Sequence, residues 1–311
     1  MNIVYACNDY YIPQTGISII SVCENNKDID NITFYFLSDN VSDSNIQILE
    51  NIVSKYNRKL EIIPFKQISY DLNISDLGRH IATIYAKVFF SRIEGLNRAI
   101  YLDSDIVVVG SLQELWNTDL DGCFMGAVQT FTKSRAVLGL PEDCPFFNDG
   151  MAIVNVDYCR KNDLIEKVKA VVEKFDGAPP VLSEGALNVV CKDHVKYISL
   201  RYNLMAGILY FYRLDKKYLY QRLSVYPPED ISESCEHPVC IHYLTAFYNR
   251  PWFTPCNHPY RDEYYKYQEM SPWNELKPTP KSLPMRARMI DLCFRLLGTK
   301  LTNIIRGKVN S

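Results

Sequence analysis

Residues 99–110 read AIYLDSDIVVVG, an almost continuous apolar run that is interrupted by two aspartates. Such a run is typical of a central strand in a parallel sheet, because helices cover both faces of that kind of sheet. Asp103 and Asp105 fall where the strand is expected to end. Ligands of open α/β sheets bind beyond the carboxyl ends of the strands, so the sequence places a candidate active site at these aspartates.

The chain before this run alternates β-branched segments with segments of helical periodicity. IVYA, TFYFLS and LEIIPF are predicted strands. A helix is predicted after Ser42, its N-cap, and a buried helix over residues 82–93. Strand, helix and strand in series imply parallel strands with right-handed crossovers.

The second half continues the alternation. CFMGAVQ, AIVNV and VCIHYL are predicted strands, PFFNDG (residues 145–150) a loop, and residues 163–175 a helix. Prolines at 278, 280 and 284 mark a linker. We therefore expect an α/β fold with a mostly parallel central sheet flanked by helices. Residues 1–276 would form the catalytic domain, and residues 277–311 a basic amphipathic tail.

Composition narrows the class of protein. The 311 residues are 47% hydrophobic, as in a folded globular protein, and the net charge of −2 argues against a nucleic-acid binder. The ten cysteines contain no C-x-x-C pair, which favours reduced, mostly buried thiols over a zinc or disulfide framework. The beginning, MNIVYACNDYY, has no secretory leader, so we expect a cytoplasmic protein.

The tail differs in charge from the rest of the chain. From residue 277 onward, eight Lys and Arg face Asp291 alone, so the tail carries +7 and the remainder −9. Residues 283–309 mix these cations with apolar side chains, a composition typical of an interfacial helix and too charged to span a bilayer. We expect contact with an anionic surface, at the inner face of the plasma membrane. The alternative is docking on the catalytic domain.

The tripeptide Asp103-Ser104-Asp105 has the pattern of a cation site. Residues i and i+2 share one face of a strand, so both carboxylates can reach one ion. Two carboxylates suit Mg²⁺ or Mn²⁺, whose other ligands are commonly phosphate oxygens. The alternative is that the acids cap a turn.

His242 and Arg250 follow the last apolar run. Paired with the distant aspartates, His242 is a candidate third ligand, and its nitrogen favours Mn²⁺ over Mg²⁺. Arg250 would neutralise a departing diphosphate. The alternatives are an ordinary core or surface histidine and an ordinary surface arginine.

These groups fit the cleavage of a glycosyl–phosphate bond. The departing nucleoside diphosphate carries negative charge, which a cation and Arg250 would stabilise. The sugar becomes oxocarbenium-like, so a carboxylate near its anomeric carbon lowers the barrier. Glu184 and Asp149 are the candidate acids.

Several blocks of the chain together resemble glycosyltransferase family 8, the retaining, nucleotide-diphospho-sugar-dependent enzymes that include bacterial lipopolysaccharide galactosyl- and glucosyltransferases and glycogenin. The similarity covers residues 1–255. It rests on six blocks in the family's order: IVYACNDYY, ATIYAKVFFSRI, NRAIYLDSDIVVVGSLQELWNTDLDG, FFNDGMAIVNVD, SEGALN and residues 242–252. The resemblance implies the "A" type fold of nucleotide-sugar transferases (GT-A).

The resemblance also implies residue roles. The metal ligands would be Asp103, Asp105 and His242, binding Mn²⁺ or Mg²⁺. The residues expected to contact the UDP-sugar donor are Ala6, Asn8 and Tyr11 at the uracil and ribose, Lys87 near the phosphates or sugar, Ser104 between the ligands, and Asn148 and Gly150 in the sugar pocket. The implied reaction moves glucose or galactose to a saccharide or lipid-linked oligosaccharide acceptor, in polysaccharide or lipopolysaccharide synthesis.

Two blocks depart from the family pattern. Asp-Gln-Asp is replaced by Ser183-Glu184-Gly185, which leaves the donor sugar open. Glu184 is then a nucleophile, a stabiliser of positive charge, or a first-turn residue of a helix capped by Ser183. The usual His-x-x-Gly-x-x-Lys-Pro-Trp is two residues longer here, without the glycine and with Arg250 for lysine.

Two alternative functions remain open. One is a metal-dependent nucleotidyl- or phosphotransferase, although the chain lacks a Gly-rich phosphate loop. The other is a catalytically altered sugar-nucleotide binding protein, which the changed SEGALN block suggests.

Overall fold

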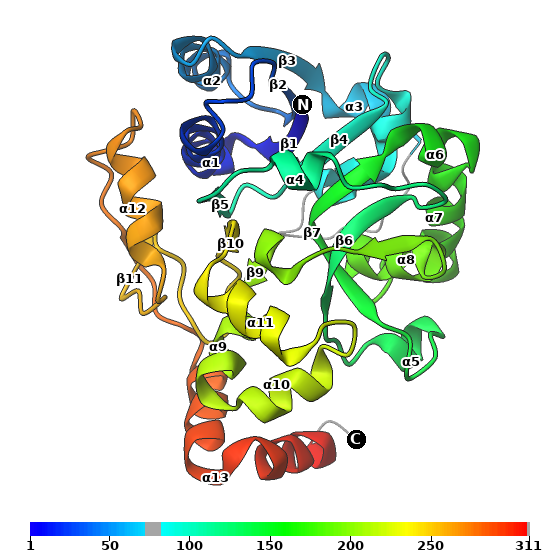
Figure 1. The fold of residues 1–311 in the computed structure, drawn as a ribbon, viewed down its shortest axis with the longest axis vertical. Helices are drawn as coiled ribbons and strands as arrows, with labels where there is room; N and C mark the ends of the chain where they lie inside the picture. Colours follow the sequence, from blue (N-terminus) through cyan, green and yellow to red (C-terminus); the bar gives the residue numbers. More distant parts are fainter. Residues whose placement is uncertain (72–81, 310–311) are drawn as a thin grey trace.

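The computed structural model describes residues 1–71 and 82–309, the last four by their backbone alone. Its main sheet has the strand order β3-β2-β1-β4-β7-β6-β8, and β7 alone runs against the others (Figure 1). The strands are β1 (Asn2–Asn8), β2 (Thr33–Asp39), β3 (Lys59–Pro64), β4 (Arg98–Leu102), β6 (Met125–Thr130), β7 (Phe146–Asn155) and β8 (Val195–Tyr197). The predicted mostly parallel sheet is confirmed.

Helices cover both faces of this sheet. In Figure 1, α1 and α2 lie on one side, and α6, α7 and α8 on the other. The α-helices are α1 (Ile12–Asn25), α2 (Asp43–Lys55), α3 (Phe65–Ile68), α4 (Gln113–Trp116), α5 (Arg135–Leu138), α6 (Val156–Lys161), α7 (Leu164–Lys174), α8 (Leu182–Cys191), α9 (Ala206–Leu214), α10 (Lys216–Arg222), α11 (Pro228–Glu236), α12 (Arg261–Glu269) and α13 (Met285–Val309). The 3₁₀ helices are η1 (Asp9–Tyr11), η2 (Ala82–Arg92) and η3 (Leu200–Tyr202).

The interior of strand β1 is apolar because helices cover both of its faces. Ile3 and Tyr5 pack in the core that contains α1 and α2, whereas Val4 and Ala6 pack in the core that contains η2, α7 and α8. Successive side chains of a strand point to opposite faces, so a strand that is covered on both faces needs apolar residues at every position.

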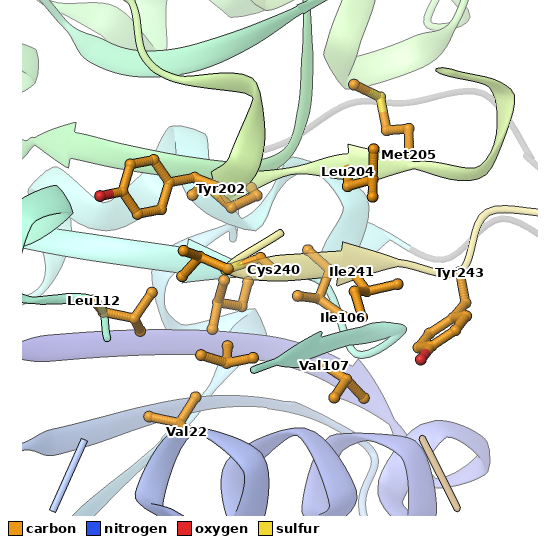
Figure 2. Close-up of a cluster of buried hydrophobic side chains, with 14 of the residues drawn as sticks. Val22, Ile106, Val107, Leu112, Tyr202, Leu204, Met205, Cys240, Ile241 and Tyr243 are labelled. Carbon is orange, nitrogen blue, oxygen red and sulfur yellow. The ribbon is translucent and has the colours of Figure 1, made fainter. Parts of the chain in front are cut away.

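The run at residues 99–110 is not one strand. Its first part is β4, and its second part is β5 (Ile106–Val108), which belongs to a second sheet of order β5-β10-β9. The other strands there are β9 (Leu204–Met205) and β10 (Cys240–His242). Figure 2 shows side chains of the three strands, among them Val107, Ile241 and Leu204, packed above α1. The two aspartates lie in the turn between the sheets.

The predicted buried helix over residues 82–93 is present as the 3₁₀ helix η2, in a segment rich in β-branched and aromatic residues, which disfavour the α-helix. One predicted element differs from the structure. PFFNDG is not a loop, because Phe146 to Gly150 form the first half of β7. This half pairs with β6 across a register shift between Ala127 and Val128. Residues 149–151 are the extra residues of β7 at this shift and have no partner in β6.

The C-terminal segment packs in part on the rest of the chain. The linker contributes β12 (Thr279–Pro280), which pairs with β11 (Phe253–Thr254). Helix α13 then lies at one end of the molecule, with a break in its helical geometry at Gly298 (Figure 1). Phe294 buries its ring against α9. No helix within the described residues is long and apolar enough to cross a membrane.

Candidate functional site

The turn between β4 and β5 holds Asp103 and Asp105 in a fixed geometry. The Asp103 backbone N–H donates to the carbonyl oxygen of Gly150 at 2.8 Å, and the Ile106 N–H donates back to the Asp103 carbonyl at 3.1 Å. The Tyr101 hydroxyl donates to Asp103 Oδ1 at 2.7 Å. Because the ends of both strands are fixed in their sheets, the turn presents the two carboxylates on one side.

His242 reaches the aspartates through strand pairing. In the second sheet His242 lies opposite Ile106, the residue that follows Asp105. Its Nε2 atom is 3.1 Å from Asp105 Oδ1 and 3.7 Å from Asp103 Oδ2. One ligand atom from each of the three residues lies within 4.8 Å of the other two. The structure therefore brings together the three residues that the sequence predicts as metal ligands.

The three side chains fit a divalent cation. His242 Nδ1 hydrogen-bonds Asn203 Oδ1 at 2.9 Å, whereas the fully buried Nε2 has no hydrogen-bond partner among the described residues. A buried nitrogen without a partner is costly unless something else satisfies it. Two carboxylates and one imidazole form a donor set that suits Mn²⁺ or Mg²⁺, with Mn²⁺ favoured by the nitrogen.

Gly150 leaves room for this cluster. A Cβ atom at this position would overlap Asp103 Oδ2 and His242 Cε1. Any residue other than glycine would therefore displace two of the three side chains. Gly150 was predicted from the sequence as part of the sugar pocket, and the structure places it behind the candidate metal ligands.

The charges at the cluster are unequal. Burial raises the pKa of Asp103. Burial also acts to raise that of Asp105, but the imidazole of His242 and the guanidinium of Arg250 outweigh it and lower the Asp105 pKa to about 2. Arg250 Nη2 lies 2.8 Å from Asp105 Oδ2. Asp105 therefore remains ionised at neutral pH, beside a fixed positive charge.

A cavity of about 360 Å³ opens beside these groups. The predicted residues that line it are Ala6, Tyr11, Asp103, Ser104, Asp105 and Arg250. The Tyr11 hydroxyl accepts a hydrogen bond from Arg250 Nη1 at 3.2 Å, and the Ser104 hydroxyl accepts one from Thr15 at 2.8 Å. Asn8 ends β1, and its Oδ1 atom is buried without a partner among the described residues. Asn8 and His242 are not among the residues that line the cavity. The polar groups of Tyr11, Ser104 and Arg250 lie around a space large enough for part of a small molecule.

A second cluster contains the other predicted residues. The buried Lys87 ammonium pairs with Asp149 Oδ2 at 2.9 Å and lies 4.5 Å from the centre of the Tyr101 ring. The Ser183 hydroxyl donates to the same Asp149 oxygen at 2.6 Å. Lys87 therefore has an internal partner, and it is not among the residues that line the 360 Å³ cavity.

Glu184 lies beside this cluster. It accepts a hydrogen bond from Asn148 Nδ2 at 2.6 Å. Burial, and then the charge of Asp149, raise the Glu184 pKa to about 8. Glu184 is consequently protonated at neutral pH, which is unusual for a carboxyl group and is often seen at functional sites.

The start of α8 places Ser183 and Glu184. Val181 and Leu182 adopt left-handed backbone angles, with φ of 54° and 52°, which side-chain-bearing residues rarely adopt. The helix begins at Leu182, so Glu184 lies in its first turn as predicted. The prediction that Ser183 caps the helix is wrong, because the N-cap position is Val181 and the Ser183 hydroxyl bonds Asp149 instead.

Three polar residues at the site were missed by the sequence prediction. Tyr101 and Thr15 hydrogen-bond Asp103 and Ser104, and Asn203 hydrogen-bonds His242. Tyr101 alone had a local signal, since it stands two residues before Asp103 on the same strand face. Thr15 and Asn203 reach the site only through the tertiary fold.

Known proteins are similar to this chain in sequence and in fold. The family described as "Glycosyl transferase family 8" matches residues 2–255. A protein of Haemophilus influenzae is 29% identical over 210 residues, which are 65% of this chain and 63% of that protein, so the chain spans less than two thirds of that relative's length. Lipopolysaccharide 1,2-glucosyltransferase of Escherichia coli K12 is 25% identical over 292 residues, 89% of this chain and 80% of that enzyme.

Solved structures establish the fold independently. The galactosyltransferase LgtC, crystallised with donor and acceptor sugar analogues, superposes with a TM-score of 0.70 at 22% identity and covers 93% of this chain and 99% of its own. The predicted GT-A fold is thereby confirmed. The match across residues 2–255, which includes the turn with Asp103 and Asp105, shows that the chain belongs to glycosyltransferase family 8.

Proposed function

We propose that this chain transfers a hexose, glucose or galactose, from a UDP-sugar to a saccharide acceptor with retention of anomeric configuration. The observation that carries the proposal is the buried Nε2 of His242, which lies 3.1 Å from Asp105 and 3.7 Å from Asp103 without a well-aligned hydrogen bond among the described residues. Family membership supplies the reaction class, glycosyl transfer. The UDP-sugar donor, the hexose and the retention of configuration are the finer parts of the proposal.

Asp103, Asp105 and His242 would hold the cation, Mn²⁺ in preference to Mg²⁺. A cation bound there supplies positive charge to the departing diphosphate. Arg250 adds a second positive charge at the same place, and its planar guanidinium suits phosphate oxygens. Ala6, Asn8 and Tyr11 would bind the nucleoside, and Ala6 and Tyr11 line the cavity.

Glu184 and Asp149 are the proposed acids beside the donor sugar. Asp149 is ion-paired with Lys87, which leaves Glu184 as the carboxyl group without a cationic partner within hydrogen-bonding distance among the described residues. A glycosyl–enzyme adduct on Glu184, trapped with a slow donor and found by mass spectrometry, would identify Glu184 as a nucleophile. Undiminished transfer in Glu184→Gln would instead exclude Glu184 as the nucleophile.

The proposed acceptor belongs to cell-surface polysaccharide or lipopolysaccharide. Support comes from the Escherichia coli relative, which is named as a lipopolysaccharide glucosyltransferase, and from relatives in Streptococcus pneumoniae named as glycosyltransferases. A lipid-linked oligosaccharide is the acceptor that best matches the properties of the tail.

Helix α13 supports a peripheral position on an anionic membrane. Its exposed apolar residues recur every three or four positions, at Met285, Met289, Leu292 and Leu296, as on one face of a helix. The exposed cations beside them are Arg286, Arg288, Arg295 and Lys300. Arg306 and Lys308 also belong to the predicted basic tail, but their side chains lie outside the described residues. Together, apolar and basic groups favour anionic lipid.

A liposome assay tests this part of the proposal. The full chain should sediment with anionic liposomes, while a chain ending at residue 280 or the double variant Leu292→Glu/Leu296→Glu should remain in solution. Neutral liposomes are the control. Equal sedimentation of all three proteins would contradict membrane binding through α13.

Donor turnover tests the reaction itself. Purified protein, Mn²⁺ and a panel of radiolabelled nucleotide sugars should release free hexose from one UDP-sugar. Sugar phosphate or pyrophosphate would indicate a nucleotidyl- or phosphotransferase, and tight binding without turnover a sugar-nucleotide binding protein. Asp103→Ala and Asp105→Ala should lose Mn²⁺-dependent donor binding while their melting temperatures stay near that of the parent. Full activity in either variant would remove the metal assignment.

A further inference from the structure

Asn203 is a fully buried amide that lies between the metal cluster and the sugar pocket. It follows η3 and immediately precedes β9, the strand that pairs in parallel with the strand of His242. Its Oδ1 atom is 2.9 Å from His242 Nδ1, and its Nδ2 atom is 2.8 Å from Asn148 Oδ1. The Asn203 amide therefore makes one hydrogen bond to the candidate metal ligand His242 and one to Asn148 in the second cluster.

The backbone decides which end of each amide faces which partner. The Gly150 N–H can only donate, and it points to the side-chain amide of Asn148 at 3.2 Å, so Asn148 presents its oxygen there. The nitrogen of Asn148 then donates to Glu184. The Asn148 oxygen also lies 2.8 Å from the Asn203 amide, and because an oxygen can only accept, the Asn203 atom at this distance must be its nitrogen. The oxygen of Asn203 then faces His242.

This order of hydrogen bonds fixes the imidazole tautomer. An amide oxygen can only accept, so Nδ1 of His242 must carry a proton. With Nδ1 committed to Asn203, Nε2 is the nitrogen left to bind a cation, and it faces Asp103 and Asp105. A ring nitrogen binds a cation only through an unprotonated lone pair. The hydrogen bond at the other ring nitrogen commonly determines which of the two nitrogens binds the metal.

We propose that Asn203 is a positioning residue that holds His242 in the metal-binding tautomer and links it through Asn148 to Glu184. The proposal rests on the metal site proposed above. It predicts that loss of the Asn203 oxygen frees the imidazole to rotate and to place its proton on either nitrogen. The Mn²⁺ affinity should then fall about 10- to 100-fold, the usual effect of removing a partner of a ligating histidine.

Two substitutions separate this role from simple packing. Asn203→Asp retains an oxygen that accepts the Nδ1 proton, so its Mn²⁺ affinity should equal or exceed that of the parent. Asn203→Leu has a similar volume and no acceptor, so it should show the loss. Asn26→Leu is the matched control, because Asn26 is also fully buried but bonds the backbone of Val22 and Leu112 and makes no hydrogen bond to Asp103, Asp105 or His242.

The experiment titrates the full chain with MnCl₂ and follows free Mn²⁺ by electron paramagnetic resonance. Weaker binding in Asn203→Leu, with parental binding in Asn203→Asp and Asn26→Leu, is the expected result. Parental affinity in a folded Asn203→Leu protein overturns the proposal. If that variant does not fold, Asn203→Ala takes its place, because alanine also lacks a side-chain acceptor, with the same loss of affinity expected and the same overturning result.

A second measurement needs no variant. In ¹⁵N-histidine-labelled, metal-free protein, long-range ¹H–¹⁵N spectra should show a proton on Nδ1 of His242, whether or not Nε2 carries one too. Protonation at Nε2 alone would overturn the assignment of the Nδ1 proton. If the proposed metal site itself is wrong, the result differs from a failure of the Asn203 proposal. The parent protein would then show no Mn²⁺ binding that depends on Asp103 and Asp105.

Discussion

Replacement of Gly150 by alanine tests the packing of the metal cluster. The added Cβ would lie 2.5 Å from His242 Cε1, whereas ordinary contacts of a Cβ begin at 3.4 Å, so the imidazole must move by about 0.9 Å (3.4 − 2.5) or the strand must shift. Metal–ligand distances tolerate changes of about 0.2 Å. The displacement therefore exceeds what one bound ion can accommodate, and at least one ligand should be lost.

Calorimetric titration with MnCl₂ and UDP measures the effect. We expect Gly150→Ala to weaken Mn²⁺ binding by at least about tenfold, or about 1.4 kcal/mol. The free energy of unfolding should fall by about 1–3 kcal/mol, as is usual when a tightly packed site is overfilled. Gly207→Ala is the control, because a Cβ there has no heavy atom within 4 Å. Parental Mn²⁺ affinity in Gly150→Ala would refute the proposed position of the ion.

Two other predictions concern Glu184 and Arg250. Glu184 has a pKa of about 8 in the folded chain, against an ordinary value of 4.5. As the pH rises, the unfolded chain therefore loses this proton before the folded chain does. The folded state loses stability between about pH 4.5 and pH 8 as a result. Glu184→Gln should therefore match the parent in melting temperature at pH 5 and exceed it at pH 8.5, whereas a difference independent of pH would contradict the assignment. Arg250→Gln should bind UDP with Mn²⁺ about 10- to 100-fold more weakly in calorimetry, because a charge-assisted hydrogen bond contributes about 1.5–3 kcal/mol, and Arg250→Lys should lose less. Equal UDP affinity in Arg250→Gln would place the diphosphate elsewhere.

Local patterns were sufficient to predict most of the sheet. Strands β1, β2 and β3 follow from apolar segments whose ends are marked by polar residues, and helix α7 from its amphipathic period. The break at Asp103 was also visible, but the move of β5 to a second sheet was not. That move depends on pairing with β10, more than 130 positions later in the chain, and no local pattern carries such information.

The error at PFFNDG has a similar origin. Asn148, Asp149 and Gly150 are residues that favour turns, so the sequence indicates a loop. In the structure, buried Phe146 and Phe147 anchor the segment, Asn148 pairs with Val128 of β6, and residues 149–151 are the extra residues of β7 at the register shift. Tertiary pairing outweighs the local preference.

The candidate site also has a part that the sequence could predict and a part that it could not. Asp103, Asp105 and His242 were predicted because both aspartates follow an apolar strand, His242 follows another apolar run, and the surrounding blocks resemble glycosyltransferase family 8. Asn203 was missed because it has no motif and lies 39 positions from His242 and 55 from Asn148. Only the fold shows that one amide contacts both.

Anomalous diffraction tests the central claim most directly. Crystals grown with MnCl₂ and UDP and measured at the manganese absorption edge should show one strong peak, coordinated by His242 Nε2 and by carboxylate oxygens of Asp103 and Asp105. Binding of the ion requires no large movement of these side chains, since their ligand atoms already lie within 4.8 Å of one another. A peak bound by other residues, or UDP bound with no manganese at these three side chains, would contradict the account.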